Sequence, residues 1–179
     1  MKLVILDRDG VINKDSVHSI KSPEEWIPIE GSLEAIRLLN KSGYTVVVAT
    51  NQSAIGKKLI SNVTLDNIHK KMQDLLDKKK GKIDKIFYCP HVEEDHCTCR
   101  KPKTGLMVKI KEHYNISLEK IPAIGDSKRD LEAYSKSEAQ PILVRTGNGK
   151  DVEKRKSFPS NTLIFDNLLE ASKFIIKME

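Results

Sequence analysis

Near its start the chain carries the stretch Leu3-Val4-Ile5-Leu6-Asp7-Arg8-Asp9-Gly10-Val11. This stretch predicts the central strand of an α/β protein, followed by residues at the ligand-binding edge of its sheet. Four consecutive apolar residues are typical of a strand buried on both faces, because a half-exposed strand alternates apolar and polar residues. The run then breaks into two carboxylates separated by one residue. Open α/β sheets bind ligands at the carboxyl ends of their strands, so the acidic pair is expected at the binding edge.

Similar apolar runs recur along the chain, separated by helical patterns. In the helix expected over 64–79, apolar residues recur on one face, and Thr64 is the expected N-cap. This alternation implies parallel strands with right-handed crossovers, hence a three-layer, doubly wound α/β sandwich with a mostly parallel central sheet. We expect one domain over 1–179 and a mobile basic loop over 148–159. The expected strands are 3–6, 45–49, 86–88, 121–124, 141–144 and 162–165, and the expected helices are 32–41, 64–79, 104–114, 129–137 and 167–177.

The composition is that of an ordinary globular protein, with 39% hydrophobic and 31% charged residues. A net charge of +6 favours an anionic partner, such as nucleic acid, a membrane surface or a phosphorylated metabolite. Aromatic residues make up 5% of the chain and do not interleave with the basic clusters, which argues against the rival interpretation, a zinc-stabilised nucleic-acid-binding module. The sequence shows neither a signal peptide nor the ~20 apolar residues of a membrane helix, so a cytoplasmic protein without a membrane partner is expected.

The acidic side chains after the first strand predict a magnesium site. Asp7 and Asp9 cannot share a small space as bare anions, because like charges raise each other's pKa. A divalent cation removes this conflict, and Mg²⁺ prefers hard oxygen ligands. One aspartate is then free to act as a nucleophile while the other transfers a proton. Asp126 follows another buried strand and is a candidate third metal ligand, whereas Asp130 is expected to brace that loop or cap its helix.

Neutral and cationic side chains elsewhere complete a phosphate-binding pattern. The stretch Thr50-Asn51-Gln52-Ser53 follows the second strand and offers a dense set of donors suited to phosphate oxygens. Arg100 and Lys101 precede a proline, which restricts the backbone there. Arg100 can supply a bidentate fork and Lys101 a point charge. Together with the aspartates, these residues predict a Mg²⁺-assisted phosphoryl-transfer site.

A cysteine cluster predicts a second, structural metal site. Three cysteines and a histidine lie close together in the chain and form a complete tetrahedral set for Zn²⁺. The expected ligands are Cys89, His91, Cys97 and Cys99. His96 adjoins Cys97 and is the alternative histidine ligand. The ion would fold a polar loop over about 89–99, which would fix the adjacent Arg100 and Lys101 over the phosphate.

These motifs resemble the four ordered motifs of the haloacid dehalogenase (HAD) superfamily of phosphatases. The matching positions are Asp7-Arg8-Asp9-Gly10, Thr50, Lys101 and Gly125-Asp126. The resemblance implies that Asp7 is the nucleophile that forms an aspartyl-phosphate. It implies that Asp9 protonates the leaving alkoxide and then takes a proton from water. It also implies that Mg²⁺ is held by the Asp7 carboxylate, the Asp9 backbone carbonyl and the Asp126 carboxylate, with Thr50 and Lys101 on the phosphoryl group.

The cysteine loop ahead of Arg100 resembles two groups of small HAD phosphatases that lack a large cap domain. One group removes the C7 phosphate of D-glycero-D-manno-heptose 1,7-bisphosphate, in lipopolysaccharide or S-layer sugar biosynthesis, and the other hydrolyses histidinol phosphate. The stretches 11–15, 21–26, 51–53 and 143–149 favour the heptose group, which makes a small phosphosugar the expected partner. By this resemblance the substrate-contacting residues are Asp15, Ser16, Val17, His18, Asn51, Gln52, Ser53 and Arg100. A monomer is the default expectation.

The chain departs from the heptose group at two places. The stretch Ser53-Ala54-Ile55-Gly56-Lys57-Lys58 stands where many members have Ser-Gly-(Ile/Leu)-Ala-Arg-Gly, and Ser127 stands where some have Lys. Both departures concern substrate preference and leave the chemistry unaffected.

Overall fold

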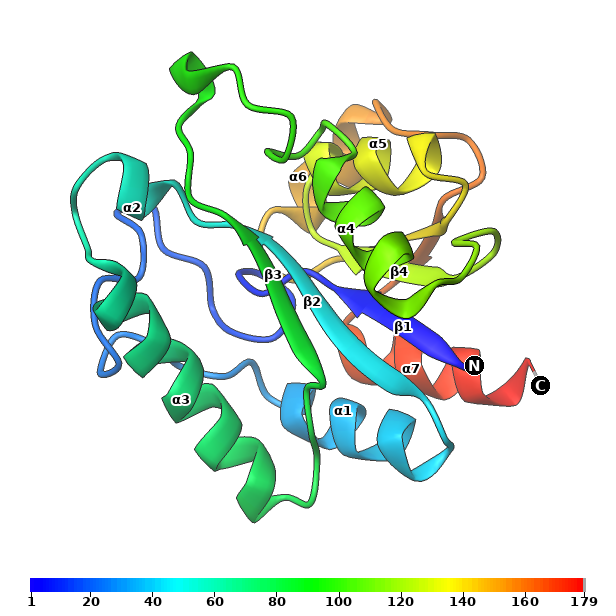
Figure 1. Ribbon diagram of the computed structural model, residues 1–179. Coiled ribbons are helices and arrows are strands. Elements are labelled where there is room, and N and C mark those ends of the chain that lie inside the picture. Colours follow the sequence, from blue (N-terminus) through cyan, green and yellow to red (C-terminus); the bar gives the residue numbers. More distant parts are fainter. Residues whose placement is uncertain (179) are drawn as a thin grey trace.

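The computed structural model describes residues 1–178, which form a six-stranded sheet (Figure 1). The strand order is β3-β2-β1-β4-β5-β6, and neighbouring strands pair in parallel. The first strand therefore lies inside the sheet, as its apolar run predicts. The strands are β1 (Leu3–Leu6), β2 (Thr45–Asn51), β3 (Lys85–Cys89), β4 (Pro122–Gly125), β5 (Gln140–Val144) and β6 (Leu163–Phe165).

Helices cover both faces of the sheet and make three layers. On one face pack α1 (Ser32–Lys41), α3 (Asn62–Lys78) and α7 (Leu168–Lys177), and on the other pack α4 (Gly105–Tyr114) and α5 (Lys128–Lys136) (Figure 1). The remaining elements are α2 (Ser53–Gly56), the 3₁₀ turn η1 (Glu93–Asp95) and α6 (Gly149–Arg155). Within residues 1–178, no helix is long and apolar enough to cross a bilayer. The predicted doubly wound α/β sandwich is confirmed.

The side chains of β1 divide between two cores. Leu3 and Ile5 belong to the core beneath α4 and α5, whereas Val4 and Leu6 belong to the core beneath α1, α3 and α7. Successive side chains of a strand point to opposite faces, so an unbroken apolar run is stable only where each face is covered.

The carboxyl ends of the central strands meet at one edge of the sheet. Strand order reverses beside β1, which is the switch point where α/β sheets bind ligands. The backbone N–H of Asp7 donates to the carbonyl of Ile124 in β4 at 2.8 Å, and that of Gln52 donates to the carbonyl of Cys89 in β3 at 2.7 Å. These hydrogen bonds bring the segments that leave four strands into one region.

Two local expectations are wrong. The region expected as a mobile basic loop contains the helix α6. Its Glu153 forms an ion pair with Arg145, just after β5, with 2.7 Å between Glu153 Oε2 and Arg145 Nε. This pair anchors a segment composed largely of good helix formers. The third helix begins at Asn62 with Ser61 as its N-cap, because the Ser61 hydroxyl accepts the N–H of Thr64 at 3.1 Å.

Candidate functional site

A cleft of about 420 Å³ opens at the carboxyl ends of the central strands. His18 is exposed and does not line this cleft, unlike the three residues before it. The cleft is also lined by residues that were not predicted from the sequence, among them Lys57, Arg129 and Asn148. The predicted residues that do line it are Asp7, Asp9, Asp15, Ser16, Val17, Thr50, Asn51, Gln52, Ser53, Arg100, Lys101 and Asp126.

Three buried carboxylates converge in the cleft. Oxygen atoms of Asp7, Asp126 and Asp130 all lie within 4.8 Å of one another. Burial, followed by the charge of Asp130, raises the pKa of Asp7 to about 7 and that of Asp126 to about 8. Asp7 Oδ1 is buried and accepts no well-aligned hydrogen bond from the described residues, although the Lys101 ammonium lies 3.1 Å away. A set of oxygens that resist ionising together fits a hard divalent cation such as Mg²⁺.

Lys101 places a positive charge beside Asp7. Its side chain is 1% exposed, and Nζ lies 3.1 Å from Asp7 Oδ1 and 2.6 Å from Asp130 Oδ1. Asn51 holds the Lys101 backbone, because its side-chain amide donates to the carbonyl at 3.1 Å and accepts the N–H at 3.0 Å. The end of β2 thus positions a buried cation where it can stabilise a transferring phosphoryl group.

A separate group of donors holds Asp9. Its Oδ1 accepts from Asn13 Nδ2 at 2.9 Å, and its Oδ2 accepts from Gln52 Nε2 at 2.9 Å. Arg8 adds hydrogen bonds from Nε and Nη2 at 2.9–3.0 Å. Burial opposes ionisation of Asp9, but the Arg8 charge and these hydrogen bonds outweigh it and lower its pKa. The carboxylate is therefore fixed in its ionised form, with 22% of the side chain still exposed.

The loop after β5 fixes Asp126. Asn148 donates to Asp126 Oδ2 from its backbone N–H at 2.8 Å and from Nδ2 at 3.0 Å. Gly10 and Gly147, at φ of 80° and 56°, approach this carboxylate so closely that a Cβ at either position would overlap it. Glycine at both positions therefore lets the two turns pack directly against the Asp126 carboxylate and hold it in place.

Asp130 has the structural role expected from the sequence and a second role as well. It forms a capping box with Ser127 at the start of α5, because its Oδ2 accepts the Ser127 N–H at 3.0 Å. Through its other oxygen it pairs with Lys101. No role was predicted for Arg8, Asn13 or Asn148. Arg8 and Asn148 lie shortly after strand ends, the one signal that could have identified them, whereas Asn13 lies further along the loop after β1.

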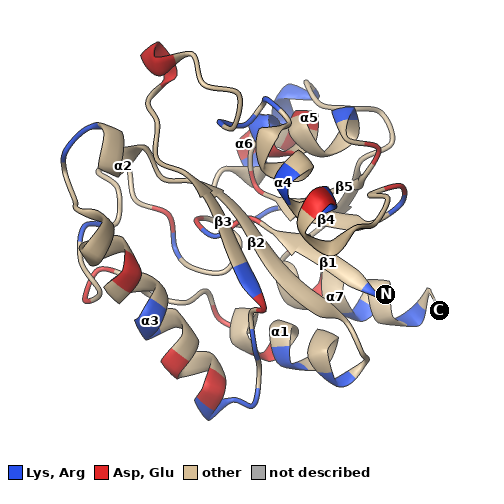
Figure 2. Ribbon diagram, viewed as in Figure 1, with Lys and Arg blue, Asp and Glu red and all other residues tan. Residues whose placement is uncertain are grey.

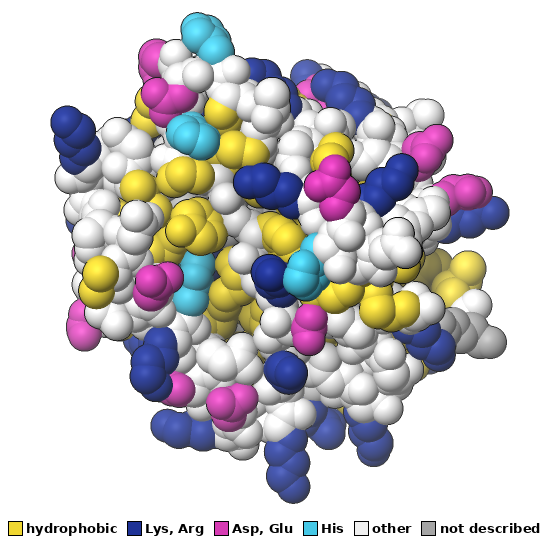
Figure 3. Space-filling view, viewed as in Figure 1, with side chains coloured by type: hydrophobic (Ala, Val, Ile, Leu, Met, Phe, Trp, Pro, Cys, Tyr) yellow, Lys and Arg dark blue, Asp and Glu magenta, His cyan; other side chains and the backbone are white. Residues whose placement is uncertain are grey.

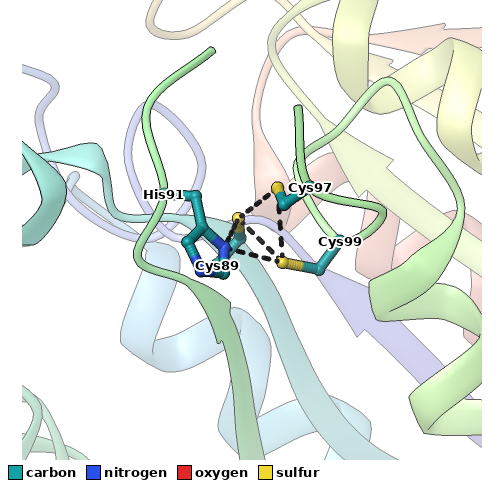
Figure 4. A group of neighbouring side chains, drawn as sticks. All are labelled: Cys89, His91, Cys97 and Cys99. Atoms are coloured by element: carbon teal, nitrogen blue, oxygen red, sulfur yellow. Dashed lines mark hydrogen bonds between the residues drawn. The ribbon is translucent and has the colours of Figure 1, made fainter. Parts of the chain in front are cut away.

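The cysteines and one histidine form a second cluster, next in sequence to Arg100. The side chains of Cys89, His91, Cys97 and Cys99 point toward one another from the end of β3 and the loop after it (Figure 4). The Cys97 Sγ lies 3.6 Å from the Cys89 Sγ and 3.7 Å from the Cys99 Sγ, and His91 Nδ1 lies 3.3 Å from the Cys99 Sγ. Ligands at about 2.0–2.3 Å from a tetrahedral zinc lie about 3.5–3.8 Å apart. The cluster is somewhat more compact than that, because the Sγ atoms of Cys89 and Cys99 lie 3.0 Å apart.

This cluster has the donor set of a closed, four-coordinate site. The three cysteines are free thiols, so no disulfide competes for them within the described chain. His91 belongs to the group, whereas His96 is exposed and lies outside it. The residues therefore fit a structural metal ion, with His91 and not His96 as the histidine ligand.

Fold and site together define an HAD-like phosphatase: a parallel α/β sheet with paired acids after β1, a hydroxyl near the end of β2, a lysine before α4 and a further acid after β4. A solved HAD-like phosphatase from Mesorhizobium loti shares this fold, with a TM-score of 0.79 at 24% identity over 99% of this chain and 87% of the other. The family model described as polynucleotide kinase 3 phosphatase matches residues 2–141.

Closer relatives carry a more specific name. The D-glycero-β-D-manno-heptose-1,7-bisphosphate 7-phosphatase of Pseudomonas putida is 49% identical over 98% of this chain and 100% of its own length. The crystal structure of the B. bronchiseptica D,D-heptose 1,7-bisphosphate phosphatase, complexed with magnesium and phosphate, matches with a TM-score of 0.99 and 43% identity over 100% of both chains. The chain belongs to the D-glycero-β-D-manno-heptose-1,7-bisphosphate 7-phosphatase family.

Proposed function

We propose that this chain is a Mg²⁺-dependent phosphatase that removes the C7 phosphate of D-glycero-D-manno-heptose 1,7-bisphosphate, in lipopolysaccharide or S-layer sugar biosynthesis. The observation that carries the proposal is full-length similarity, at a TM-score of 0.99, to a heptose bisphosphate phosphatase complexed with magnesium and phosphate. The convergence of Asp7, Asp126 and Lys101 in one cleft supports it.

The proposed reaction has two steps. Asp7 attacks phosphorus to form an aspartyl-phosphate, and Asp9 gives a proton to the leaving alkoxide of the sugar. Asp9 then takes a proton from the water that hydrolyses the aspartyl-phosphate. A substrate phosphate beside Asp9 adds negative charge, which favours the protonated form that the first step needs.

The remaining groups position the phosphoryl group and neutralise its charge, which is most of what phosphoryl transfer requires. Mg²⁺ would be held by the carboxylates of Asp7 and Asp126 and the backbone carbonyl of Asp9, and when bound it neutralises negative charge at the reacting phosphate. Lys101 and Thr50 would contact the same phosphoryl oxygens. The sugar would lie against Asp15, Ser16, Val17, His18, Asn51, Gln52, Ser53 and Arg100, of which His18 alone lies off the cleft.

Substrate preference tests the proposal directly. We expect kcat/KM for the heptose 1,7-bisphosphate to exceed that for histidinol phosphate, because the cleft presents Arg100, Lys57 and Arg129 to a second anionic group. Both anomers of the bisphosphate and a panel of sugar phosphates belong in the assay. A higher kcat/KM for histidinol phosphate would identify histidinol phosphate as the substrate instead. Salt-sensitive RNA or DNA binding without phosphatase activity would favour a nucleic-acid-binding module over an enzyme. Acidic and basic residues are intermixed along α3 (Figure 2).

Magnesium affinity should increase with pH. The raised pKa values of Asp7 and Asp126, about 7 and about 8, mean that the metal-free site holds protons at pH 6 that Mg²⁺ must displace. The Kd for Mg²⁺ is expected to fall about tenfold or more between pH 6 and pH 8. Titration calorimetry in buffers of different ionisation enthalpy counts the protons released. A Kd that stays constant across this range, without proton release, contradicts this description of the site.

The cysteine cluster is proposed to bind one structural Zn²⁺ per chain. Cys97→Ser removes one of its ligands and should abolish zinc retention, as measured by elemental analysis of the purified protein. Activity should fall about tenfold, less than on loss of the nucleophile, because the loop carries the neighbouring Arg100. His96→Ala is the matched control and should retain zinc. Absence of zinc from the unmutated protein, or its loss from the control, would disprove the assignment.

The location, the assembly and the domain organisation stay predictions. We propose a cytoplasmic monomer with one domain over residues 1–179 and a zinc loop at about 89–99, acting on a small phosphosugar and binding neither nucleic acid nor membrane. Gel filtration with light scattering measures the state of assembly.

A further inference from the structure

The side chain of Arg8 connects the active-site cleft to helix α3. It is completely buried, and its Nη2 donates to both Asp9 oxygens and to Gln52 Oε1 at 2.9–3.0 Å. On its other side, Arg8 Nη1 lies 3.1 Å from His69 Nε2. His69 is 61 positions away in sequence and does not line the cleft. We propose that His69 is a positioning residue for the Asp9 carboxylate, acting through Arg8.

The chemistry of the pair determines which atom donates. A guanidinium has only donors, so His69 Nε2 must be the acceptor and its ring must be neutral. Burial and the nearby Arg8 charge both lower the pKa of His69, to about 3, which keeps the ring neutral. The ring packs edge-on against Tyr88 of β3, with centroids 6.3 Å apart. His69 is therefore a fixed acceptor for a buried cation.

Loss of that acceptor would be transmitted to Asp9. Arg8 Nη1 would be left as a buried donor without a partner, and such groups rearrange to find one. Rotation of the guanidinium would alter the hydrogen bonds that Nε and Nη2 make to the Asp9 oxygens. His69 also lines a groove between α3 and β3, where hydrophobic side chains gather on the molecular surface (Figure 3). Water entering from that groove could satisfy the freed donor but would not restore the original position of Arg8.

The choice of leaving group separates this role from general damage to the fold. A sugar alkoxide needs the proton from Asp9, whereas p-nitrophenolate leaves without one. The ratio kcat/KM reports the steps up to formation of the aspartyl-phosphate. A misplaced Asp9 should therefore lower kcat/KM for the sugar phosphate and spare that for p-nitrophenyl phosphate, whereas damage to the fold should lower both. This inference rests on the proposed role of Asp9.

The experiment compares His69→Leu, His69→Gln and the control His113→Leu. His113 packs edge-on against Phe87 of the same strand but from α4, on the opposite face of the sheet. We expect His69→Leu to lower kcat/KM for the heptose bisphosphate about tenfold or more, with p-nitrophenyl phosphate changed less than about twofold. The amide oxygen of His69→Gln can accept from Arg8 and should restore most of the loss. The control should resemble the unmutated protein.

Two outcomes would overturn the inference: an equal loss on both substrates, or a glutamine variant as impaired as the leucine variant. Should His69→Leu not fold, His69→Phe keeps a ring against Tyr88 without an acceptor and makes the same comparison. Asp9→Asn in parallel separates this test from the proposed function. If Asp9→Asn shows no dependence on the leaving group, the role of Asp9 fails. If it shows the dependence and His69→Leu does not, only the role of His69 fails.

Discussion

Asp7→Asn is expected to reduce kcat by about 10³-fold or more, because it removes the nucleophile at nearly constant shape. The fold should survive this substitution and become slightly more stable in the absence of metal at pH 8. The raised pKa of Asp7 means that its ionised form is disfavoured in the folded chain, so stability is lost as pH rises from about 4 through about 7. A neutral amide avoids that loss.

The measurement pairs steady-state kinetics with thermal melting at pH 6 and pH 8. Asp151→Asn on α6 is the control, since it removes an exposed carboxylate that does not line the cleft. Retention of more than about a tenth of the activity by Asp7→Asn would disprove the assignment of the nucleophile. A variant that is less stable than the unmutated protein at pH 8 would instead contradict the electrostatic description.

Lys101→Met is expected to damage both stability and turnover. The substitution keeps much of the side-chain volume but leaves Asp7 and Asp130 without their buried cation, and breaking a buried pair typically costs about 3–5 kcal/mol. Turnover should fall about 10²-fold or more, because the lysine would stabilise charge on the phosphoryl group. Urea denaturation and steady-state kinetics measure the two effects, and Mg²⁺ should recover part of the stability by replacing the missing charge.

Lys109→Met is the matched control, because Lys109 is an exposed residue of α4 that does not line the cleft. Its stability should change by less than about 0.5 kcal/mol. A Lys101→Met variant that is as stable as this control without metal would mean that Asp7 and Asp130 do not depend on the lysine.

The central strand and the aspartates that converge in the cleft could be predicted because their signals are local. The run Leu3–Leu6 needs a core on both faces, and that requirement alone places it inside a covered sheet. Asp7 and Asp126 each end a buried strand, and parallel topology brings such ends to one edge. The cysteine cluster was predicted for a similar reason, since Cys89 and Cys99 are close in sequence and their side-chain chemistry is distinctive.

Only the tertiary structure showed how these groups are held. The contact between Arg8 and His69 spans 61 positions, and that between Asn148 and Asp126 spans 22. Hydrogen bonds between buried polar groups depend on how a helix packs against a sheet, and residue type and spacing along the chain do not specify that packing. The sequence by itself therefore determined that Asp7 and Asp126, which follow buried strands, reach one edge of the sheet. The packed structure decided which of them are charged, paired or fixed, because burial and neighbouring charge set each pKa and each partner.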